Sequence, residues 1–496
     1  MRKKAIIHNI IGGFSNFGFA FLTSIIFLPY YFKFISIADY GIWLGGISLL
    51  SLVSIFEANI SLILTQQLGK QLINKNPLKF SKYLSAAIFF SLCVSVLIIC
   101  ITYFLKENIT SWISPDEIEK KLFSNSFFLY SISLSLTIIS GYIGSVFQVF
   151  LITFKQPIYN LIASFVGVFF TIWLVPSQGV LAIAFGFLIK SILYTLLIVL
   201  GSIKILKYNK INICFNLTYL PELLYSIGLP FISKVMMTSA MSAQNFLVAA
   251  TISASATTIF EITKKLPLIN ISLVNIIAMA TFTSFSLFYS ENGDNSKLHK
   301  YTKHYFNLVR VLLVISLGSI FLIGQDFVTL WVGADKFGGN FLLALICIGA
   351  MSDQLRMILA QQYYALGKFN LTSITDLIFA ISFFIFAALL MSILGLKGIV
   401  LSGILANVIC FVVSSFLEKK RGVEMVPHII TKTLMIDLII VISISAITML
   451  ILQLFIVSDL LKLLLIILSI LSLIFIFYKK EQLLFKFLIL KFNKSK

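Results

Sequence analysis

Long apolar segments follow one another through most of this 496-residue chain, and they constrain its fold more than any other feature. A membrane-spanning helix needs about 20 mostly apolar residues. The composition agrees with many such spans: 59% of the residues are hydrophobic and 11% are charged. A water-soluble monomer would not tolerate so large an apolar surface. The candidate spans are 9–32, 40–65, 84–105, 122–154, 158–176, 180–201, 225–250, 256–288, 304–324, 339–362, 371–394, 398–417, 432–456 and 459–478. The sequence therefore predicts an all-α polytopic membrane protein with about 14 transmembrane helices.

The basic residues are distributed unevenly among the gaps between these spans. Of the 38 Lys and Arg residues, 25 are assigned to alternate gaps, the span ends beside them and the two chain ends. Nine are assigned to the other gaps and the span ends beside those, and four lie in the interior of spans. Cytoplasmic segments carry an excess of Lys and Arg, so this pattern predicts that both chain ends are cytoplasmic. Trp43, Trp112, Trp173 and Trp331 all fall at predicted outer ends, as expected of an aromatic belt. The net charge of +19 then reflects orientation beside anionic membrane lipids and not nucleic-acid binding.

The sequence lacks features that several classes of membrane protein require. The longest predicted loops, 106–121 outside and 202–224 inside, are too short to form a separate domain. A membrane glycosyltransferase or polymerase would need a substantial outer loop, so we do not expect an enzyme. The G-x-x-x-x-G-K-[ST] pattern of a nucleotide-binding loop is missing from the sequence, which argues against ATP hydrolysis. The cysteines and histidines show no metal spacing, so no metal or cofactor is expected.

A weak internal repeat relates two parts of the chain. Gln148 precedes Lys155 by seven residues, and Gln361 precedes Lys368 by the same spacing. Each pair ends the fourth span of a set of six. Six is an even number, so both sets enter the membrane in the same direction, which predicts two parallel six-helix bundles around a central cavity. The expected divisions are bundles at 1–210 and 211–422, two additional transmembrane helices within 423–478, and a basic amphipathic cytoplasmic tail at 479–496.

The repeat also assigns counterparts to individual residues. Gly179 opens the span 180–201, and Gly398 opens the span 398–417. This register places Ile409 opposite Lys190, so a lysine at that position is not required by both bundles.

Short motifs occur in a characteristic order across residues 9–420. They are Asn9, Gly13 and Pro29 in the first span, Asp39-Tyr40-Gly41, Gly293-Asp294 before Lys297-Leu298, Leu330-Trp331-Val332-Gly333, and Ala365-Leu366-Gly367-Lys368. In this order they resemble the bacterial polysaccharide flippases, which export lipid-linked oligosaccharides of the O-antigen type. That family belongs to the multidrug/oligosaccharidyl-lipid/polysaccharide exporter superfamily. The chain departs from the family at Glu57-Ala58-Asn59, where the family often has Asp-x-Gly.

The resemblance implies a function in polysaccharide or lipopolysaccharide biosynthesis. It implies a flippase that moves a polyprenyl-pyrophosphate-linked oligosaccharide from the inner to the outer leaflet of the bacterial cytoplasmic membrane by alternating access. Its implied partners are that glycan, membrane lipids, a polysaccharide polymerase and a chain-length regulator. Two alternatives are a multidrug or cation exporter of the same superfamily, which would need a carboxylate-rich cavity, and a membrane glycan polymerase or transferase.

Basic residues inside spans are the candidates for binding pyrophosphate, because charges are costly there and usually functional. Lys234 is the preferred one, since it lies about two turns into the span 225–250, and the resemblance implies that this span lines the cleft. The alternative interpretation is that the Lys234 side chain extends to the inner membrane–water interface. Lys190, Arg310 and Arg356 are the other substrate-binding candidates. For Lys190, pairing with a carboxylate is the alternative, and for Arg310 extension to the inner interface is the preferred interpretation.

Asp353 and the residues at the outer end of the eighth span are candidates for gating or ion coupling. Asp353 and Arg356 are three residues apart and share a helix face, which predicts an internal ion pair. Glu261 stands three and four residues before Lys264 and Lys265, so a local salt bridge is the simplest interpretation and an outer gate is the alternative.

Two further acids, Glu57 and Asp376, are interpreted from their position in the spans. Glu57 is flanked by apolar residues, and desolvation favours the neutral form of a carboxyl group, so Glu57 is the candidate proton carrier. Its alternative is an anchoring salt bridge to a neighbouring helix. Asp376 lies near an inner span end, and we predict that it is interfacial.

Overall fold

The computed structural model is helical throughout most of the part of the chain that it describes, and no strand occurs in that part. The described residues are 15, 18–19, 22–51, 55–113, 117–212, 214–225, 228–269, 271–272, 275, 295–365 and 368–421. Within them, eight helices are long and apolar enough to cross a membrane, and two shorter apolar helices cover Leu22–Tyr31 and Ile37–Leu50. The prediction of an all-α polytopic membrane protein is therefore confirmed. The predicted spans 432–456 and 459–478 and the tail 479–496 lie outside the described residues.

The chain packs as two compact units, residues 1–258 and 259–496. The bundles 1–210 and 211–422 were defined from the repeat and not from packing, and they stay a prediction. Each unit has its own buried core, so the candidate residues are considered below unit by unit.

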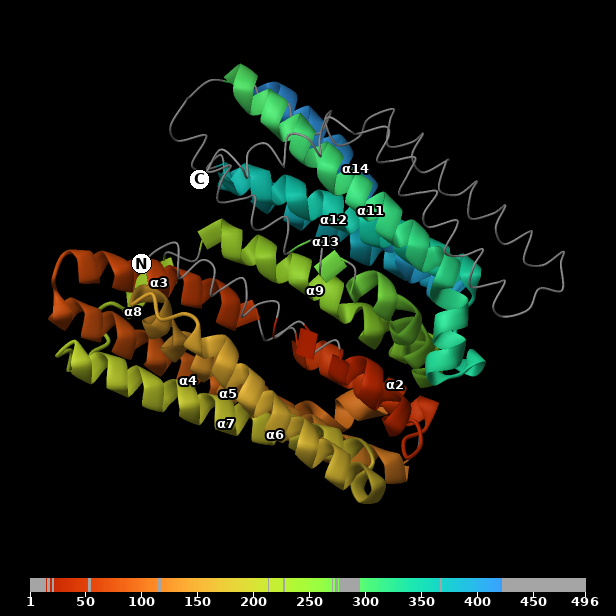
Figure 1. The fold of residues 1–496 in the computed structure, drawn as a ribbon, viewed down its shortest axis with the longest axis horizontal. Helices are drawn as coiled ribbons and strands as arrows, with labels where there is room; N and C mark the ends of the chain where they lie inside the picture. Colours follow the sequence, from red (N-terminus) through yellow and green to blue (C-terminus); the bar gives the residue numbers. More distant parts are fainter. Residues whose placement is uncertain are drawn as a thin grey trace, which may run out of the picture. The chain divides into compact units, whose positions relative to one another are not determined.

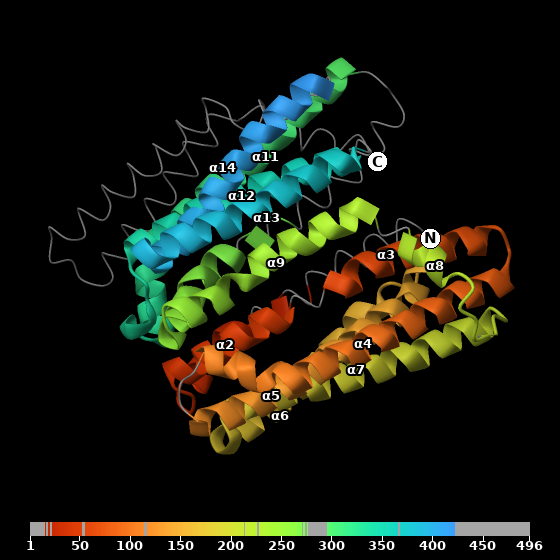
Figure 2. The same ribbon diagram turned by 180° about the vertical axis from the view of Figure 1, so that it is seen from behind.

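In the first unit, four long helices pack together and a fifth packs against a shorter one. Helix α7 packs against α5 and α6, and α4 packs against α5, as both ribbon views show (Figure 1, Figure 2). Helix α9 packs against α2. The bounds are α2 (Ile37–Leu50), α3 (Ile55–Ile73), α4 (Pro77–Ile113), α5 (Glu117–Val149), α6 (Lys155–Gln178), α7 (Val180–Tyr208), α8 (Leu220–Tyr225) and α9 (Gly228–Thr251).

In the second unit, α12 contacts each of the other long described helices. It packs against α11, α13 and α14, and α14 also packs against α13. The bounds are α11 (Asn295–Val332), the 3₁₀ helix η2 (Ala334–Lys336), α12 (Asn340–Ala365), α13 (Phe369–Leu394) and α14 (Leu396–Arg421), and residues 259–269 are helical as well. Side chains of α12 are thus placed at the centre of this unit.

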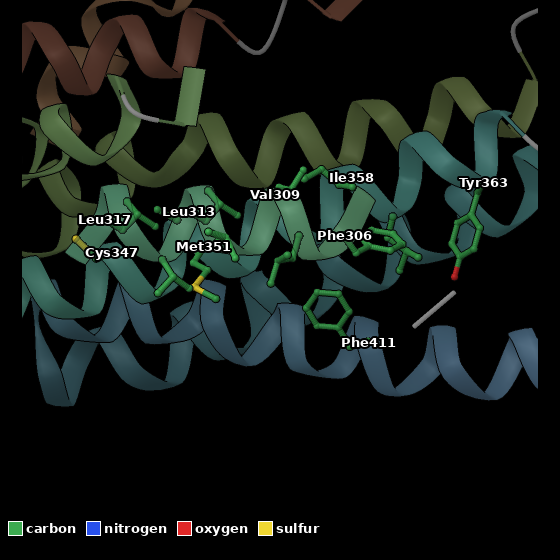
Figure 3. Close-up of a cluster of buried hydrophobic side chains, with 14 of the residues drawn as sticks. Phe306, Val309, Leu313, Leu317, Cys347, Met351, Ile358, Tyr363 and Phe411 are labelled. Atoms are coloured by element: carbon green, nitrogen blue, oxygen red, sulfur yellow. The ribbon is translucent and has the colours of Figure 1, made fainter. Parts of the chain in front are cut away.

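The core of the second unit is formed mainly by α11 and α12, with Leu371 added from α13 and Phe411 from α14. Figure 3 shows Leu317 close to Cys347 at one end of this cluster and Tyr363 at the other end. Phe411 of α14 lies beside the cluster in the same view. Burial of these side chains holds the helices of this unit together, and it leaves the polar groups of α12 to be satisfied on its remaining faces.

Most span predictions agree with the helices, but the span 40–65 is wrong as a single helix. Helix α2 ends at Leu50, where Ser51 is the C-cap, and α3 begins at Ile55. The apolar run continues through this position, so hydropathy alone could not mark the helix end. Helix α2 is held closely in the first unit, because a Cβ at Gly41 would lie only 1.7 Å from the Ala254 carbonyl oxygen.

Two equivalent turns support the internal repeat. Gly179 follows α6 with φ 51° and ψ −126°, and Gly395 follows α13 with φ 55° and ψ −130°. A positive φ of this kind favours glycine. The preceding helices end 216 residues apart (394 − 178), and α5 and α12 end with the same offset (365 − 149). Helices α5–α7 and α12–α14 are therefore related by one register.

This register corrects the residue matches predicted from the sequence. The counterpart of Gly179 is Gly395, whereas Gly398 lies inside α14. With the offset of 216, Lys190 corresponds to Ala406 and not to Ile409 (190 + 216). The sequence match was wrong because a glycine followed by a β-branched residue occurs at both Gly179 and Gly398, and only the backbone conformation distinguishes the turn.

Candidate functional site

A polar network crosses three helices in the membrane-spanning part of the second unit. Arg356 on α12 is at its centre, and its side chain is 2% exposed. Its Nε donates to Asn407 Oδ1 on α14 at 2.9 Å, and its Nη1 lies 3.1 Å from Asp376 Oδ1 on α13. The ring of Phe379 covers the guanidinium at 4.2 Å from its centroid. A cation taken out of water needs this set of partners, because desolvation costs several kcal/mol.

Asn407 connects Arg356 to a second carboxylate. Its Nδ2 donates to Asp353 Oδ1 at 2.7 Å and to Ser352 Oγ at 2.9 Å, while its Oδ1 accepts from Arg356. The Asn407 side chain is fully buried. We call Ser352, Asp353, Arg356, Asp376 and Asn407 the polar network. It contains two carboxylates and one guanidinium.

The sequence predicted an ion pair between Asp353 and Arg356, and this prediction is wrong about the partner of Arg356. Arg356 pairs with Asp376, and Asp353 is joined to Arg356 through Asn407. The helix spacing correctly placed Asp353 and Arg356 near each other, but a long guanidinium side chain reaches across to a neighbouring helix. The prediction that Asp376 is interfacial is also wrong, because its side chain is 2% exposed and lies in the core of the unit.

The local salt bridge predicted at the outer end of the eighth span is confirmed. Lys264 Nζ lies 3.2 Å from Glu261 Oε2, one helical turn away, and above the Phe260 ring at 4.7 Å. Lys265 is half-buried. The outer-gate role of these residues stays a prediction.

Lys190 lies in the first unit where α6 and α7 approach closely. A Cβ at Gly167 on α6 would be 2.8 Å from Lys190 Cβ and 2.7 Å from the Gly186 carbonyl oxygen. The Lys190 side chain is half-buried, and it forms no ion pair with any residue that the structure describes. Its predicted pairing with a carboxylate therefore does not occur within the described residues, which leaves its charge available to an anion.

Lys234 lies on α9 and is half-buried. Its Nζ is 3.6 Å from Met237 Sδ on the next turn of the same helix. Lys234 thus places a cation about two turns from the start of a helix that packs against α2. Its role as a pyrophosphate ligand stays a prediction.

Arg310 and Glu57 are the remaining site residues that were predicted from the sequence. Arg310 on α11 is 3% exposed and lies among the core residues around Val309 and Val311, so the preferred interpretation of an interfacial arginine is wrong. Glu57 is in α3, but its side chain lies outside the described residues, and its proton-carrier role stays a prediction.

Sequence reasoning missed three polar residues of the second unit. Asn407 was not singled out, although an asparagine within an apolar span was a usable signal. Tyr363 Oη donates to Glu418 Oε1 at 2.6 Å, and both side chains are buried. Glu418 stands in the basic end of α14, directly before Lys419. Its burial depends on the tertiary contact between α12 and α14.

Comparisons with solved structures show which known proteins share this fold. The chain is similar to the lipid II flippase MurJ in an inward closed conformation, with a TM-score of 0.74 and 16% identity over 96% of this chain and 99% of that protein. It is similar to a multidrug resistance MATE family transporter of the MOP superfamily, with a TM-score of 0.60 and 14% identity over 80% and 97% of the two chains. A MOP superfamily transporter from Pyrococcus furiosus matches with a TM-score of 0.54 and 14% identity over 85% and 97%.

These likenesses establish the fold of the chain as the one that MurJ and the MATE transporters share. No protein-family model matches the sequence, and no curated protein matches it either.

Proposed function

We propose that the chain is a flippase that moves a polyprenyl-pyrophosphate-linked oligosaccharide, such as a polysaccharide repeat unit, from the inner to the outer leaflet of the cytoplasmic membrane. The observation that carries this proposal is the likeness to a lipid II flippase over nearly the full length of both chains. Lipid II is a lipid-linked glycan, so that likeness supports a lipid-linked glycan as the substrate class. The short motifs of the polysaccharide flippases support the same class.

The charges of the membrane-spanning part favour an anionic substrate. Lys190 and Lys234 are half-buried on α7 and α9, and Lys190 has no carboxylate partner among the described residues. A lysine is a compact cation with three donors, which suits phosphate oxygens. Arg356 is removed from the set of proposed pyrophosphate ligands, because Asp376 neutralises its charge. Arg310 stays in the set.

A reconstitution experiment tests this function. The purified protein is placed in vesicles that contain a fluorescent polyprenyl-pyrophosphate oligosaccharide, and an impermeant quencher measures how much of it reaches the opposite leaflet. We expect rapid exchange with the wild type and a rate close to that of protein-free vesicles with Lys234→Ala. Equal rates in wild-type and protein-free vesicles would exclude the proposal.

A multidrug or cation exporter is the second candidate, because MATE transporters share the fold. Loading the same vesicles with a cationic dye distinguishes the two. Dye transport without glycan exchange would favour the exporter, and lengthening of the glycan on a gel would favour a polymerase. We expect neither result.

A further inference from the structure

Helix α9 carries a row of polar side chains along one face, inside the predicted span 225–250. Lys234, Thr238 and Asn245 follow one another at intervals of four and seven residues. At about 100° per residue, they lie within about 40° of one another around the helix. All three side chains are half-buried. Polar groups are costly beside lipid hydrocarbon, so a partly exposed row of them is expected to meet water or a polar ligand.

This face of α9 meets α2 at its predicted outer end. Helix α9 lies beside α2 in both ribbon views (Figure 1, Figure 2). Ala249 lies one turn beyond Asn245, and a Cβ at Gly45 of α2 would be 2.7 Å from the Ala249 Cβ and 3.7 Å from the Asn245 carbonyl oxygen. Thr238 and Lys234 lie about two and three turns further along α9, away from this contact. The row therefore leads from the inner part of α9 to the place where α2 covers it.

The hydroxyl group of Thr238 is available to a ligand. Within the described part of the chain, Thr238 forms no side-chain hydrogen bond, whereas Thr251 of the same helix donates to the Leu247 carbonyl oxygen at 2.7 Å. A threonine hydroxyl can donate one hydrogen bond and accept two, and the amide of Asn245 both donates and accepts. Groups of this kind suit the hydroxyl groups of a sugar, while the ammonium group of Lys234 suits phosphate.

We propose that Thr238 and Asn245 bind the glycan of the substrate while Lys234 binds its pyrophosphate. A rise of about 1.5 Å per residue places Thr238 about 6 Å and Asn245 about 17 Å from Lys234 along the helix. The sugar attached directly to the pyrophosphate lies beside Thr238, and only a longer glycan reaches Asn245. The glycan thus points toward the end of α9 that contacts α2. This order of contacts rests on the proposed flippase function.

Three lipids with glycans of different length test the order of contacts. They are polyprenyl pyrophosphate without sugar, its derivative with one sugar, and the complete lipid-linked repeat unit, the last two extracted from the source cells. The purified full chain in lipid nanodiscs is used, and competition with a fluorescent polyprenyl pyrophosphate gives the Kd of each lipid. We expect Lys234→Ala to weaken the binding of all three, because each of them carries the pyrophosphate.

Thr238→Val removes the hydroxyl group and keeps the shape of the side chain. We expect the Kd of the two glycosylated lipids to rise about twofold to tenfold, as for one lost hydrogen bond, and the Kd of the sugar-free lipid to stay the same. Thr238→Ser keeps the hydroxyl group and should bind like the wild type. An equal loss of the sugar-free lipid in Thr238→Val, or no change for any lipid, would overturn the proposal.

Asn245→Leu should weaken only the complete repeat unit, by a similar factor. Its Tm is measured alongside, because Asn245 lies at the contact with α2, and the Thr238 variants decide the proposal if this variant does not fold. Ser239→Ala is the matched control, since Ser239 is a half-buried hydroxyl residue of the same helix about 140° away from Lys234. It should leave all three Kd values unchanged. Weaker binding of the one-sugar lipid in a folded Asn245→Leu, or an effect of Ser239→Ala as large as that of Thr238→Val, would contradict the order.

The same measurements separate a failure of this proposal from a failure of the flippase function. If the wild type binds none of the three lipids and moves none of them in vesicles, the flippase function fails and the order of contacts fails with it. If the wild type binds and moves the complete repeat unit, and Thr238→Val and Asn245→Leu bind it as tightly, the function stands and the glycan contacts on α9 are excluded.

Discussion

The guanidinium of Arg356 on α12 lies 3.1 Å from the carboxylate of Asp376 on α13, and both side chains are buried. The pair joins two helices that are consecutive in the chain. Asn407 of α14 adds a third helix to this junction through Arg356 Nε. The ion pair thus fixes the geometry around Asp353 as well as neutralising Arg356.

Removal of one partner of this pair should destabilise the protein strongly. Asp376→Asn leaves a buried guanidinium without its counter-charge, which typically costs about 3–5 kcal/mol. We expect a clearly lower Tm of the detergent-solubilised protein. The double variant R356M/D376L removes both charges and should recover most of the loss. A Tm equal to the wild type in the single variant would contradict the buried pair.

The sequence predicted the helices better than the contacts between them. The span 371–394 ends at the same residue as α13, because Gly395 follows it and glycine marks the turn. The end of α2 at Leu50 was missed because no glycine or proline interrupts the apolar run there. Residue spacing therefore locates helices, and turn chemistry locates their ends.

The candidate site was predicted only in part, for a physical reason. Spacing along one helix identified the Glu261–Lys264 bridge, since both partners are on the same helix. The partner of Arg356 comes from another helix, and nothing in the local sequence specifies which helix that is. Asn407 and Glu418 were missed for the same reason, because their contacts arise from the packing of α14 against α12.

Lys234 should be needed for transport and not for folding. Lys234→Ala is expected to abolish surface glycan in cells, with an unchanged amount of protein in the membrane. Lys234→Arg keeps the charge but changes its shape and should retain part of the activity. Glycan staining and immunoblotting measure the two quantities. Full activity of the alanine variant would leave only the interpretation that Lys234 extends to the interface.

The lysine bias makes a separate prediction about membrane topology. Single cysteines at Asp335 and Leu298, in a background without native cysteines, should differ in their reaction with an impermeant thiol reagent added to intact cells. Only the cysteine at 335 should react, because residue 335 is predicted outside and residue 298 inside. Permeabilised cells provide the control, in which both should react. Equal labelling in intact cells would refute the predicted orientation.

Gly186 should tolerate no side chain, because α6 and α7 meet there. A Cβ at Gly186 would lie 1.8 Å from Thr171 Oγ1 and 2.8 Å from the Gly167 carbonyl oxygen. Gly186→Ala should therefore separate the two helices at a cost of about 1–3 kcal/mol, seen as a lower Tm. Lys190 follows one turn later on α7 and would move with the helix, so glycan exchange should also slow.

Gly403→Ala on α14 is the matched control for this prediction. Gly403 is also inside a membrane-spanning helix, but no atom lies within 4 Å of a Cβ built there. Alanine is favoured over glycine in a helix by about 1 kcal/mol, so this variant should keep or slightly raise the Tm. A loss of stability in Gly403→Ala as large as in Gly186→Ala would show that the effect comes from the helix backbone and not from the α6–α7 contact. The expected result, a lower Tm in Gly186→Ala and an equal or higher Tm in Gly403→Ala, would assign the loss of stability to the α6–α7 contact that positions Lys190.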